Sequence, residues 1–198
     1  MKIMILDTET GGKEANKFDI LQLSYQIIEY PTFSLVKQQN FYFDRQRIAS
    51  EEAININGLT DDFLAQQTTT PRNIAIKEFL IDLAGCDMLI AHSLEFDKSF
   101  IYHTCRRTHY TKRYFKVFEK LKTYDTMKET AHLCCLPFTA PRPYQNECKY
   151  KYPRLSELAE FLQVDTNGIK LHDSNSDVLL TVRCFIKLVD IGWINPSA

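Results

Sequence analysis

The sequence predicts a mixed-sheet α/β domain, with an antiparallel meander plus parallel strands flanked by α-helices. Three segments with strand character come first and are joined by short turns, which favours antiparallel pairing. Helical segments then alternate with a further short apolar strand, which favours parallel pairing. With 198 residues, 44% of them hydrophobic, the chain is long enough for one substantial core. We therefore expect one domain that spans residues 1–198.

The strands are predicted from their apolar patterns. A continuous apolar run near the N-terminus is typical of a central strand, because such a strand is buried on both faces. In the next segment the apolar residues alternate roughly with polar ones from Ile20 to Ile27, and Pro31 marks the turn that follows. These patterns predict strands within residues 2–7, 18–30, 34–44 and 87–93.

The helices are predicted from apolar residues that recur every three or four positions. In the first of them we expect Thr70 to cap the helix, Pro71 to lie in its first turn, Ile74 to belong to its apolar stripe and Gly85 to end it. The last has the clearest amphipathic pattern. The predicted helical segments are 70–85, 96–108, 113–133, 154–164 and 174–190.

Composition leaves the partner open but bears on the compartment. Lys and Arg number 24 against 25 Asp and Glu, and a net charge of −1 argues neither for nor against a polyanion, because local patches matter more than totals. No apolar run approaches the ~20 residues that span a bilayer. The six cysteines lack zinc-site spacing, and no signal peptide is recognisable. We therefore expect free thiols, no membrane association and a cytoplasmic protein.

Acidic side chains lie where the predicted strands and helices meet. Asp7 and Glu9 are two residues apart on a strand, so their side chains point to the same face. Asp97 lies near the start of one helix, where it could simply serve as an N-terminal cap. Asp177 lies in the first turn of the last helix, where Asp173 or Ser174 can do the capping. Ligands of open α/β sheets bind outside the carboxyl ends of the strands, so these acids are candidates for one site.

Four carboxylates with one histidine are typical of a metal-dependent hydrolase. Carboxylate oxygens are hard ligands that suit Mg²⁺ or Mn²⁺, and such a set can hold two divalent ions about 3.5–4 Å apart. His172 lies in the polar loop five residues before Asp177. A histidine near neutral pKa can take the proton of an attacking water. The pattern predicts a two-metal site with a histidine base.

Three motifs resemble those of the DEDDh 3′–5′ exonucleases. They are LDTETGG at 6–12, IAHSLEFDKSF at 90–100 and HDSNSD at 172–177. This DnaQ-like family has a ribonuclease H-like fold and includes the proofreading epsilon subunit of bacterial DNA polymerase III. The spacer segments 51–64, 124–133 and 152–164 are also similar to the family, so the resemblance covers nearly the whole chain in order.

The resemblance implies roles for individual residues. The implied metal ligands are Asp7, Glu9, Asp97 and Asp177, with His172 as the general base. The implied contacts to the 3′-terminal nucleotide are Thr8 and Thr10, Phe96 in the pocket, and Leu59 as a wedge beside the terminal base. Two positions depart from the family: Ser93 replaces a frequent Asn, and Asn57 replaces a frequent His. Neither is an implied ligand, so we expect these departures to affect substrate preference.

The implied activity is the release of nucleoside 5′-monophosphates from the 3′ end of DNA. Thr10 follows Glu9, whereas oligoribonucleases usually have Met there, which favours DNA over RNA. An RNA-trimming enzyme of the ribonuclease T or oligoribonuclease kind is the alternative, and a non-catalytic nucleic-acid-binding or polymerase-interaction module is a third possibility. A DNA polymerase is a possible partner, although we expect no C-terminal extension to grip one. The oligomeric state stays open.

Two basic stretches have two interpretations each. Residues 105–122 mix Arg and Lys with aromatic residues, which is typical either of a nucleic-acid contact or of a solvated helix face. Residues 148–154 carry Lys149, Lys151 and Arg154, which could contact phosphates or simply be exposed. Cys134 and Cys135 are expected to pack inside a helix.

Overall fold

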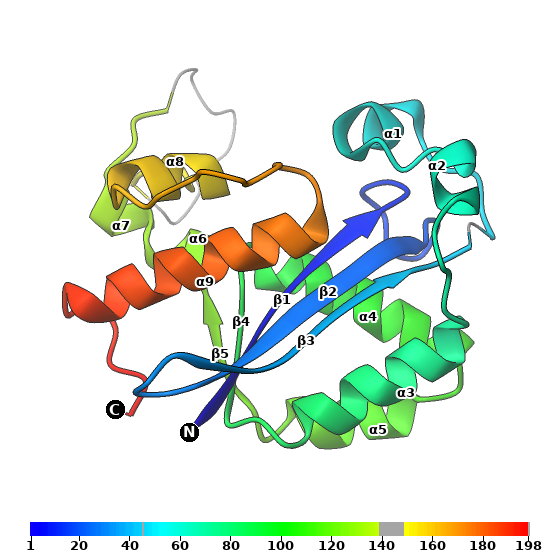
Figure 1. The fold of residues 1–198 in the computed structure, drawn as a ribbon, viewed down its shortest axis with the longest axis horizontal. Coiled ribbons are helices and arrows are strands. Elements are labelled where there is room, and N and C mark those ends of the chain that lie inside the picture. The colour runs from blue at the N-terminus through cyan, green and yellow to red at the C-terminus, as the bar shows by residue number, and fades with distance from the viewer. Residues whose placement is uncertain (45, 139–148, 198) are drawn as a thin grey trace.

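The computed structural model describes residues 1–44, 46–138 and 149–197. Its described part contains a five-stranded sheet with the order β3-β2-β1-β4-β5 (Figure 1). β1 pairs antiparallel with β2, and β2 with β3, whereas β1–β4 and β4–β5 are parallel. The predicted mixed sheet is therefore confirmed. The strands are β1 Lys2–Thr10, β2 Ile20–Glu29, β3 Ser34–Tyr42, β4 Met88–Ala91 and β5 Lys122–Asp125.

Helices cover both faces of the sheet (Figure 1). α3, α4 and α5 pack on one face, and α9 packs on the other with α8 beside it. In the described residues no helix is long and apolar enough to cross a bilayer. The helices are α1 Glu51–Asn57, α2 Asp61–Ala65, α3 Arg72–Leu83, α4 Leu94–Arg107, α5 Thr111–Phe118, α6 Thr126–Glu129, α7 Ala131–Cys134, α8 Leu155–Phe161 and α9 Ser174–Asp190.

Two parts of the predicted secondary structure are wrong. Residues 113–133 are not one helical region, because β5 lies within them and pairs along β4 through Ala91 and Asp125. β5 forms the parallel hydrogen bonds along the edge of β4. Its four residues, KTYD, show no apolar alternation, so the sequence pattern does not predict a strand there. The short helices α1 and α2 were also not predicted within 51–65.

The start of α3 also differs from the prediction. Thr70 does not cap the helix, because it lies one residue before the cap position; its backbone N–H donates to the carbonyl of Tyr42 at the end of β3. Pro71 takes the cap position without a side-chain hydrogen bond, and the helix ends at Leu83 before Gly85 is reached. Ile74 is 53% exposed rather than part of the apolar stripe, whereas Ala75 and Phe79 are buried.

The alternation of β1 divides the core into two layers. Met4 and Leu6 belong to the cluster beneath α3 and α4. Ile3 and Ile5 belong to the opposite cluster, which α9 covers with side chains that include Phe185. Because successive side chains of a strand alternate between faces, Asp7 and Glu9 continue the α9 face. The core packing therefore aims both carboxylates at the N-terminal end of α9.

The cysteine predictions have mixed outcomes. Cys134 is buried, as expected, but Cys135 is exposed at the left-handed residue that ends α7, so its packing prediction is wrong. The five cysteines in the described part of the chain are free thiols. Cys148 and most of the proline-rich loop at 137–153 lie outside the described residues.

Candidate active site

Asp7 and Glu9 lie inside β1, which continues to Thr10. Their strand partners on β2 are Ser24 and Gln22, and the register shifts between Glu9 and Thr10. Both side chains are partly buried at the carboxyl end of the central strand. They are therefore positioned by the sheet itself rather than by a loop.

The start of α9 is tied to β2 by polar contacts. The amide of Gln22 donates to Asp173 Oδ1 at 2.7 Å, and the hydroxyls of Ser24 and Ser174 are 2.6 Å apart. Asp173 is the N-cap of α9 and accepts from the backbone N–H of Ser176, which confirms the expected cap. Asp177 is therefore free for another task.

Asp177 and His172 are held together by the loop that precedes α9. The backbone N–H of His172 donates to Asp177 Oδ2 at 3.0 Å, with His172 in the left-handed region at φ 63°. Asp177 is 8% exposed, and its Oδ1 atom is buried without a hydrogen-bond partner in the described structure. A buried, unpartnered carboxylate oxygen is costly unless a cation or donor reaches it.

Asp97 reaches the same region from α4. The cap of α4 comes from Asp125, whose carboxylate accepts the backbone N–H groups of Ser93 and Leu94. The alternative that Asp97 serves as the cap is therefore wrong. Asp97 is 2% exposed and accepts a hydrogen bond from the Thr8 hydroxyl at 2.7 Å.

The four carboxylates disfavour one another's charged forms. Burial, followed by Asp97 and Glu9, raises the pKa of Asp7 well above its ordinary value. Burial, and then the charge of Asp177, raises the pKa of Glu9 to about 7. Burial raises the pKa of Asp97 to about 8, although the hydrogen bond from Thr8 lowers it. Burial also raises the pKa of Asp177 to about 6, although the hydrogen bond from the backbone of His172 lowers it. Such clustering is typical of functional sites, where a cation offsets the repulsion.

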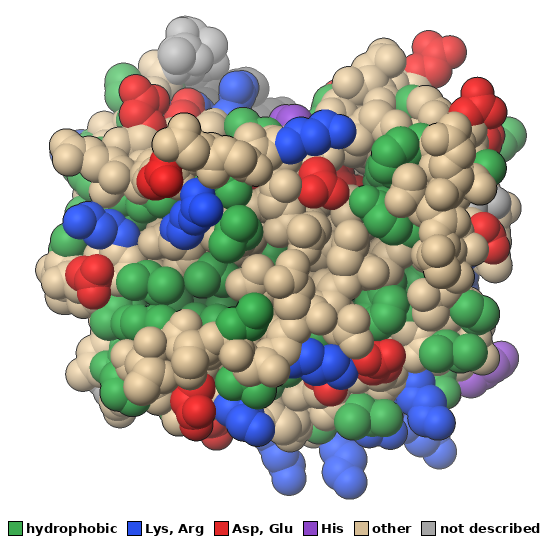
Figure 2. Space-filling model, viewed as in Figure 1, with side chains coloured by type: hydrophobic (Ala, Val, Ile, Leu, Met, Phe, Trp, Pro, Cys, Tyr) green, Lys and Arg blue, Asp and Glu red, His purple; other side chains and the backbone are tan. Residues whose placement is uncertain are grey.

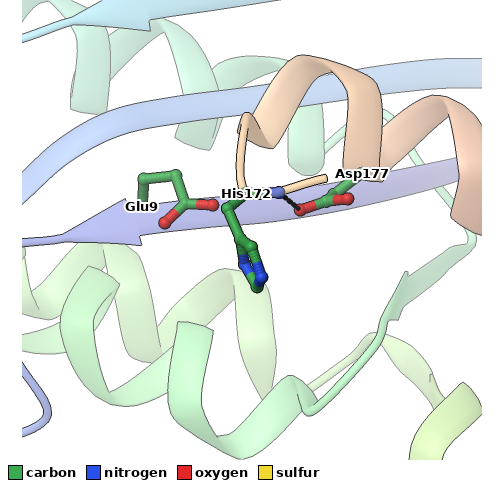
Figure 3. Close-up of side chains that lie close together, drawn as sticks. All are labelled: Glu9, His172 and Asp177. Atoms are coloured by element: carbon green, nitrogen blue, oxygen red, sulfur yellow. Dashed lines mark hydrogen bonds between the residues drawn. The ribbon is translucent and has the colours of Figure 1, made fainter. Parts of the chain in front are cut away.

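A divalent cation fits this donor set. Glu9, His172 and Asp177 each offer a ligand atom, and these atoms lie within 4.8 Å of one another (Figure 3). Figure 3 shows the three side chains meeting where β1 passes the start of α9. The unpartnered Oδ1 atom of Asp177 and the hard carboxylate oxygens suit Mg²⁺ or Mn²⁺.

One cavity, which we name the carboxylate cavity, contains all five predicted catalytic residues. It has a volume of about 350 Å³ and opens at the surface. Figure 2 shows the molecule hollowed between the α8 region and the α1 region. The predicted catalytic residues that line it are Asp7, Glu9, Asp97, Asp177 and His172, with Arg154 and Tyr152 on the wall contributed by the segment before α8.

A second, smaller cavity, which we name the side cavity, adjoins the first. It has a volume of about 160 Å³ and is lined by Thr10, Asn57 and Ile56, among others. Thr8, Glu9 and Phe96 line both cavities, so the two are contiguous. The side cavity combines the apolar side chains of Ile56 and Phe96 with polar ones, and it opens onto the acidic cavity.

The remaining predicted contact residues have different placements. Thr8 and Thr10 are buried, and the Thr10 hydroxyl donates to the carbonyl of Gly12. Ser93, at φ 79°, begins α4 and lies among neither cavity's lining residues. Leu59 is 4% exposed, packs with Leu21 and Leu64, and does not line the side cavity.

Ile56 and His92 lie at the two cavities, although neither belongs to the predicted site residues. Ile56 is 49% exposed and lines the side cavity from α1, three residues before Leu59. The ring of His92 contacts the Thr126 hydroxyl and the Pro153 carbonyl, each at 3.0 Å. Burial lowers the pKa of His92 to about 4, which suits a neutral ring that holds the wall at Pro153. His92 lies within the motif at 90–100, whereas Ile56 belongs to the spacer segment at 51–64.

Comparison with known proteins supports the predicted family. The chain is 24% identical over 195 residues to the DNA polymerase III subunit epsilon of Rickettsia conorii, covering 96% of this chain and 74% of that protein. The corresponding subunit of Buchnera aphidicola is 31% identical over 106 residues, covering 50% of this chain and 43% of that protein. No protein-family model matches the chain.

Solved structures show the same fold. Exonuclease I of E. coli, in a complex with a dT13 oligonucleotide, has a TM-score of 0.72 and 18% identity over 96% of this chain. The chain spans about two fifths (41%) of the length of that exonuclease. The chain thus resembles the DNA polymerase III epsilon subunits in sequence and has the ribonuclease H-like fold that its motifs predicted.

Proposed function

We propose that this protein is a metal-dependent 3′–5′ exonuclease that hydrolyses phosphodiester bonds from the 3′ end of DNA and releases nucleoside 5′-monophosphates. The observation that carries the proposal is the carboxylate cavity, which brings four acids and His172 together from β1, α4, α9 and the preceding loop. A nucleic-acid-binding module has no use for four carboxylates, because they repel phosphate.

The carboxylates would hold the metal ions. Asp7, Glu9, Asp97 and Asp177 would bind two Mg²⁺ or Mn²⁺ ions, of which the orphaned Oδ1 atom of Asp177 marks one ligand position. Bound ions would supply Lewis-acid stabilisation of the charge that develops on the phosphate and the leaving oxygen. The repulsion among the four acids would disappear as they bind.

His172 would move the proton of the reaction. Its ring is exposed at the cavity, and its backbone is fixed by the hydrogen bond to Asp177. A water between His172 and the scissile phosphate would give its proton to the imidazole as its oxygen attacks phosphorus. The bond from phosphorus to the 3′-oxygen of the preceding nucleotide would break, which leaves the departing nucleotide with a 5′-phosphate.

The terminal nucleotide would lie across both cavities. Ile56 and Phe96 would contact its base and sugar in the side cavity, which tolerates any base because stacking and apolar contact are not sequence-specific. Thr8 and Thr10 would border the sugar. Arg154 would face the phosphate from the opposite wall of the carboxylate cavity. Leu59, buried against Leu21 and Leu64, would support this segment rather than act as the wedge.

The relatives support DNA as the substrate. The solved exonuclease I holds a dT13 oligonucleotide, and the sequence relatives are DNA polymerase III subunits. RNA trimming is the alternative activity. A DNA polymerase as partner, a cytoplasmic location and a single exonuclease domain over residues 1–198 belong to the same proposal.

The proposal is tested with matched single-stranded DNA and RNA of one sequence, each labelled at either the 5′ or the 3′ end. With Mg²⁺ or Mn²⁺ we expect the 5′-labelled DNA to shorten stepwise and the 3′-labelled DNA to release labelled mononucleotide at once. Chelation should abolish both. Asp7→Asn is the inactive control for a contaminating nuclease, and Asp190→Asn on α9 is the matched acid-to-amide control.

Three outcomes would contradict the proposal. Activity that persists with chelator would exclude the metal mechanism, and cleavage that starts only from the 5′ end would exclude the polarity. Faster digestion of the RNA than of the DNA would replace the substrate with that of the RNA-trimming alternative.

A further inference from the structure

The basic stretch at 105–122 contains α5, whose two sides differ in chemistry. The ring of Tyr114 is 7% exposed and stacks on Phe118, with ring centroids 4.2 Å apart. Tyr102 of α4 packs edge-on against Tyr114 at 5.5 Å. The aromatic side of α5 is therefore used to attach the helix to the core.

The cations of this stretch converge on a groove, which we name the α5 groove. It has a volume of about 600 Å³, and Lys112, Arg113, Lys116 and Lys120 line it. Its apolar lining includes Leu83 at the end of α3 and Val117 on α5, and none of the acidic residues that the structure describes lines it. Figure 2 shows Lys and Arg side chains gathered along the lower edge of the molecule, where α3 and α5 lie.

These four cations contribute little to the fold. Within the described residues none of them has an ion pair or a side-chain hydrogen bond. Lys112 and Lys116 lie one turn apart on α5, which places like charges side by side and opposes formation of the helix. A site that costs stability and has no internal partner is better explained by an external one.

The α5 groove is remote from the carboxylate cavity. Cys86 and Leu121, which line the groove, immediately precede β4 and β5. Met88, the first residue of β4, lies opposite Ile3. Asp7 and Glu9 are four and six residues further along β1, about 13–20 Å away at ~3.3 Å per residue. The groove therefore lies toward the amino end of β4, and the carboxylates lie beyond its carboxyl end.

We propose that the α5 groove binds an acidic segment of a partner protein that inserts aliphatic or aromatic side chains between the cations. Carboxylates match the four cations, and the floor formed by residues such as Leu83 and Val117 matches apolar anchors. A nucleic-acid strand would instead require exposed rings for stacking. Tyr114 and Phe118 stack on each other, and the exposed ring of Phe115 does not line the groove.

The experiment is a selection of 12-residue peptides from a random phage library on the full-length protein. Peptides that bind the wild type are counted after a counter-selection on Lys116→Glu. We expect the retained peptides to share at least two Asp or Glu with at least one Leu, Ile, Phe or Trp. The Kd of a labelled consensus peptide, measured by fluorescence anisotropy with chelator present, should rise about tenfold in Lys116→Glu and less in Lys116→Gln.

The controls make each outcome decisive. Lys187→Glu reverses an exposed lysine on α9, on the opposite face of the sheet, and should bind the peptide as the wild type does. Exonuclease activity of Lys116→Glu should be unchanged, so a failure of the proposed function leaves this test intact. Selected peptides without acidic residues, or equal binding to Lys116→Glu, would overturn the proposal. Displacement of the labelled peptide by oligo(dT), with oligo(dT) binding that requires Lys116, would also overturn the proposal, because the groove would then be a nucleic-acid contact.

Discussion

The carboxylate cavity and the α5 groove, toward opposite ends of the sheet, collect charge of opposite sign under different physical conditions. The acids of the cavity are buried or partly buried and raise one another's pKa values, so their arrangement opposes folding until a cation arrives. The cations of the groove line an open surface where water screens them. The difference teaches that buried like charges indicate a site for chemistry, whereas exposed like charges indicate at most a docking surface.

Asp7→Asn should separate activity from stability most strongly. We expect exonuclease activity to fall by about 1,000-fold or more, because the proposed metal site loses one of its carboxylates. We also expect the chelated protein to melt higher than the wild type, because Asn replaces a carboxyl whose charged form is disfavoured by burial and by Asp97 and Glu9. Activity assays and thermal unfolding in chelator measure the two effects. A melting temperature of the variant below that of the wild type in chelator would show that repulsion among the acids does not destabilise the fold.

His172→Gln should distinguish proton transfer from metal binding. We expect kcat to fall by about 100-fold or more, because general-base catalysis contributes factors of this size. The rise in melting temperature caused by Mg²⁺ should remain, because the carboxylates are intact. Wild-type turnover in this variant would remove the base assignment, and loss of the Mg²⁺ effect would make His172 chiefly a metal ligand.

The stability of the metal-free protein should fall as pH rises from about 4 to 8. The pKa values in the folded protein are about 7 for Glu9, 8 for Asp97 and 6 for Asp177. In this pH window the folded protein therefore keeps protons on these side chains, whereas the unfolded chain has already released them. The contribution of these three carboxyl groups to stability is therefore fully present below the ordinary carboxyl pKa. It is lost as the pH rises through the raised pKa values. Thermal unfolding in chelator across pH, repeated with Mg²⁺, checks this.

Saturating Mg²⁺ should reduce this loss, because bound cations favour the charged carboxylates. The matched variant is Asp7→Asn, which should have a shallower pH dependence in chelator. A melting temperature that rises with pH through this window would contradict the described electrostatics.

Ile56→Ala and Leu59→Ala should have opposite readouts, although both remove one apolar side chain from the same segment. Ile56 is exposed in the side cavity, so its loss should raise KM several-fold and leave the melting temperature nearly unchanged. Leu59 is buried against Leu21 and Leu64, so its loss should cost about 2 kcal/mol or more of stability. Steady-state kinetics and denaturant unfolding measure the pair, and a larger KM effect for Leu59 would restore it as the wedge.

Much of the site could be predicted from spacing along the chain. Asp7 and Glu9 share a face because a strand alternates, and Asp173 leaves Asp177 free because an N-cap needs only one acid. These are local rules, so they hold without knowledge of the fold. The roles of Leu59 and Ile56 could not be separated in this way, because α1 was not predicted and its orientation depends on packing against Leu21 and Leu64.

The sequence by itself determined the mixed sheet, the last helix at 174–190 and the five residues gathered in the carboxylate cavity. Periodicity and ordered motifs carry this information because each depends on near neighbours in the chain. Only the tertiary structure decided that Asp125 rather than Asp97 caps α4, that β5 completes the sheet, and that the cations around α5 line one groove. These features join residues from different elements, and their positions follow from how the helices pack on the sheet.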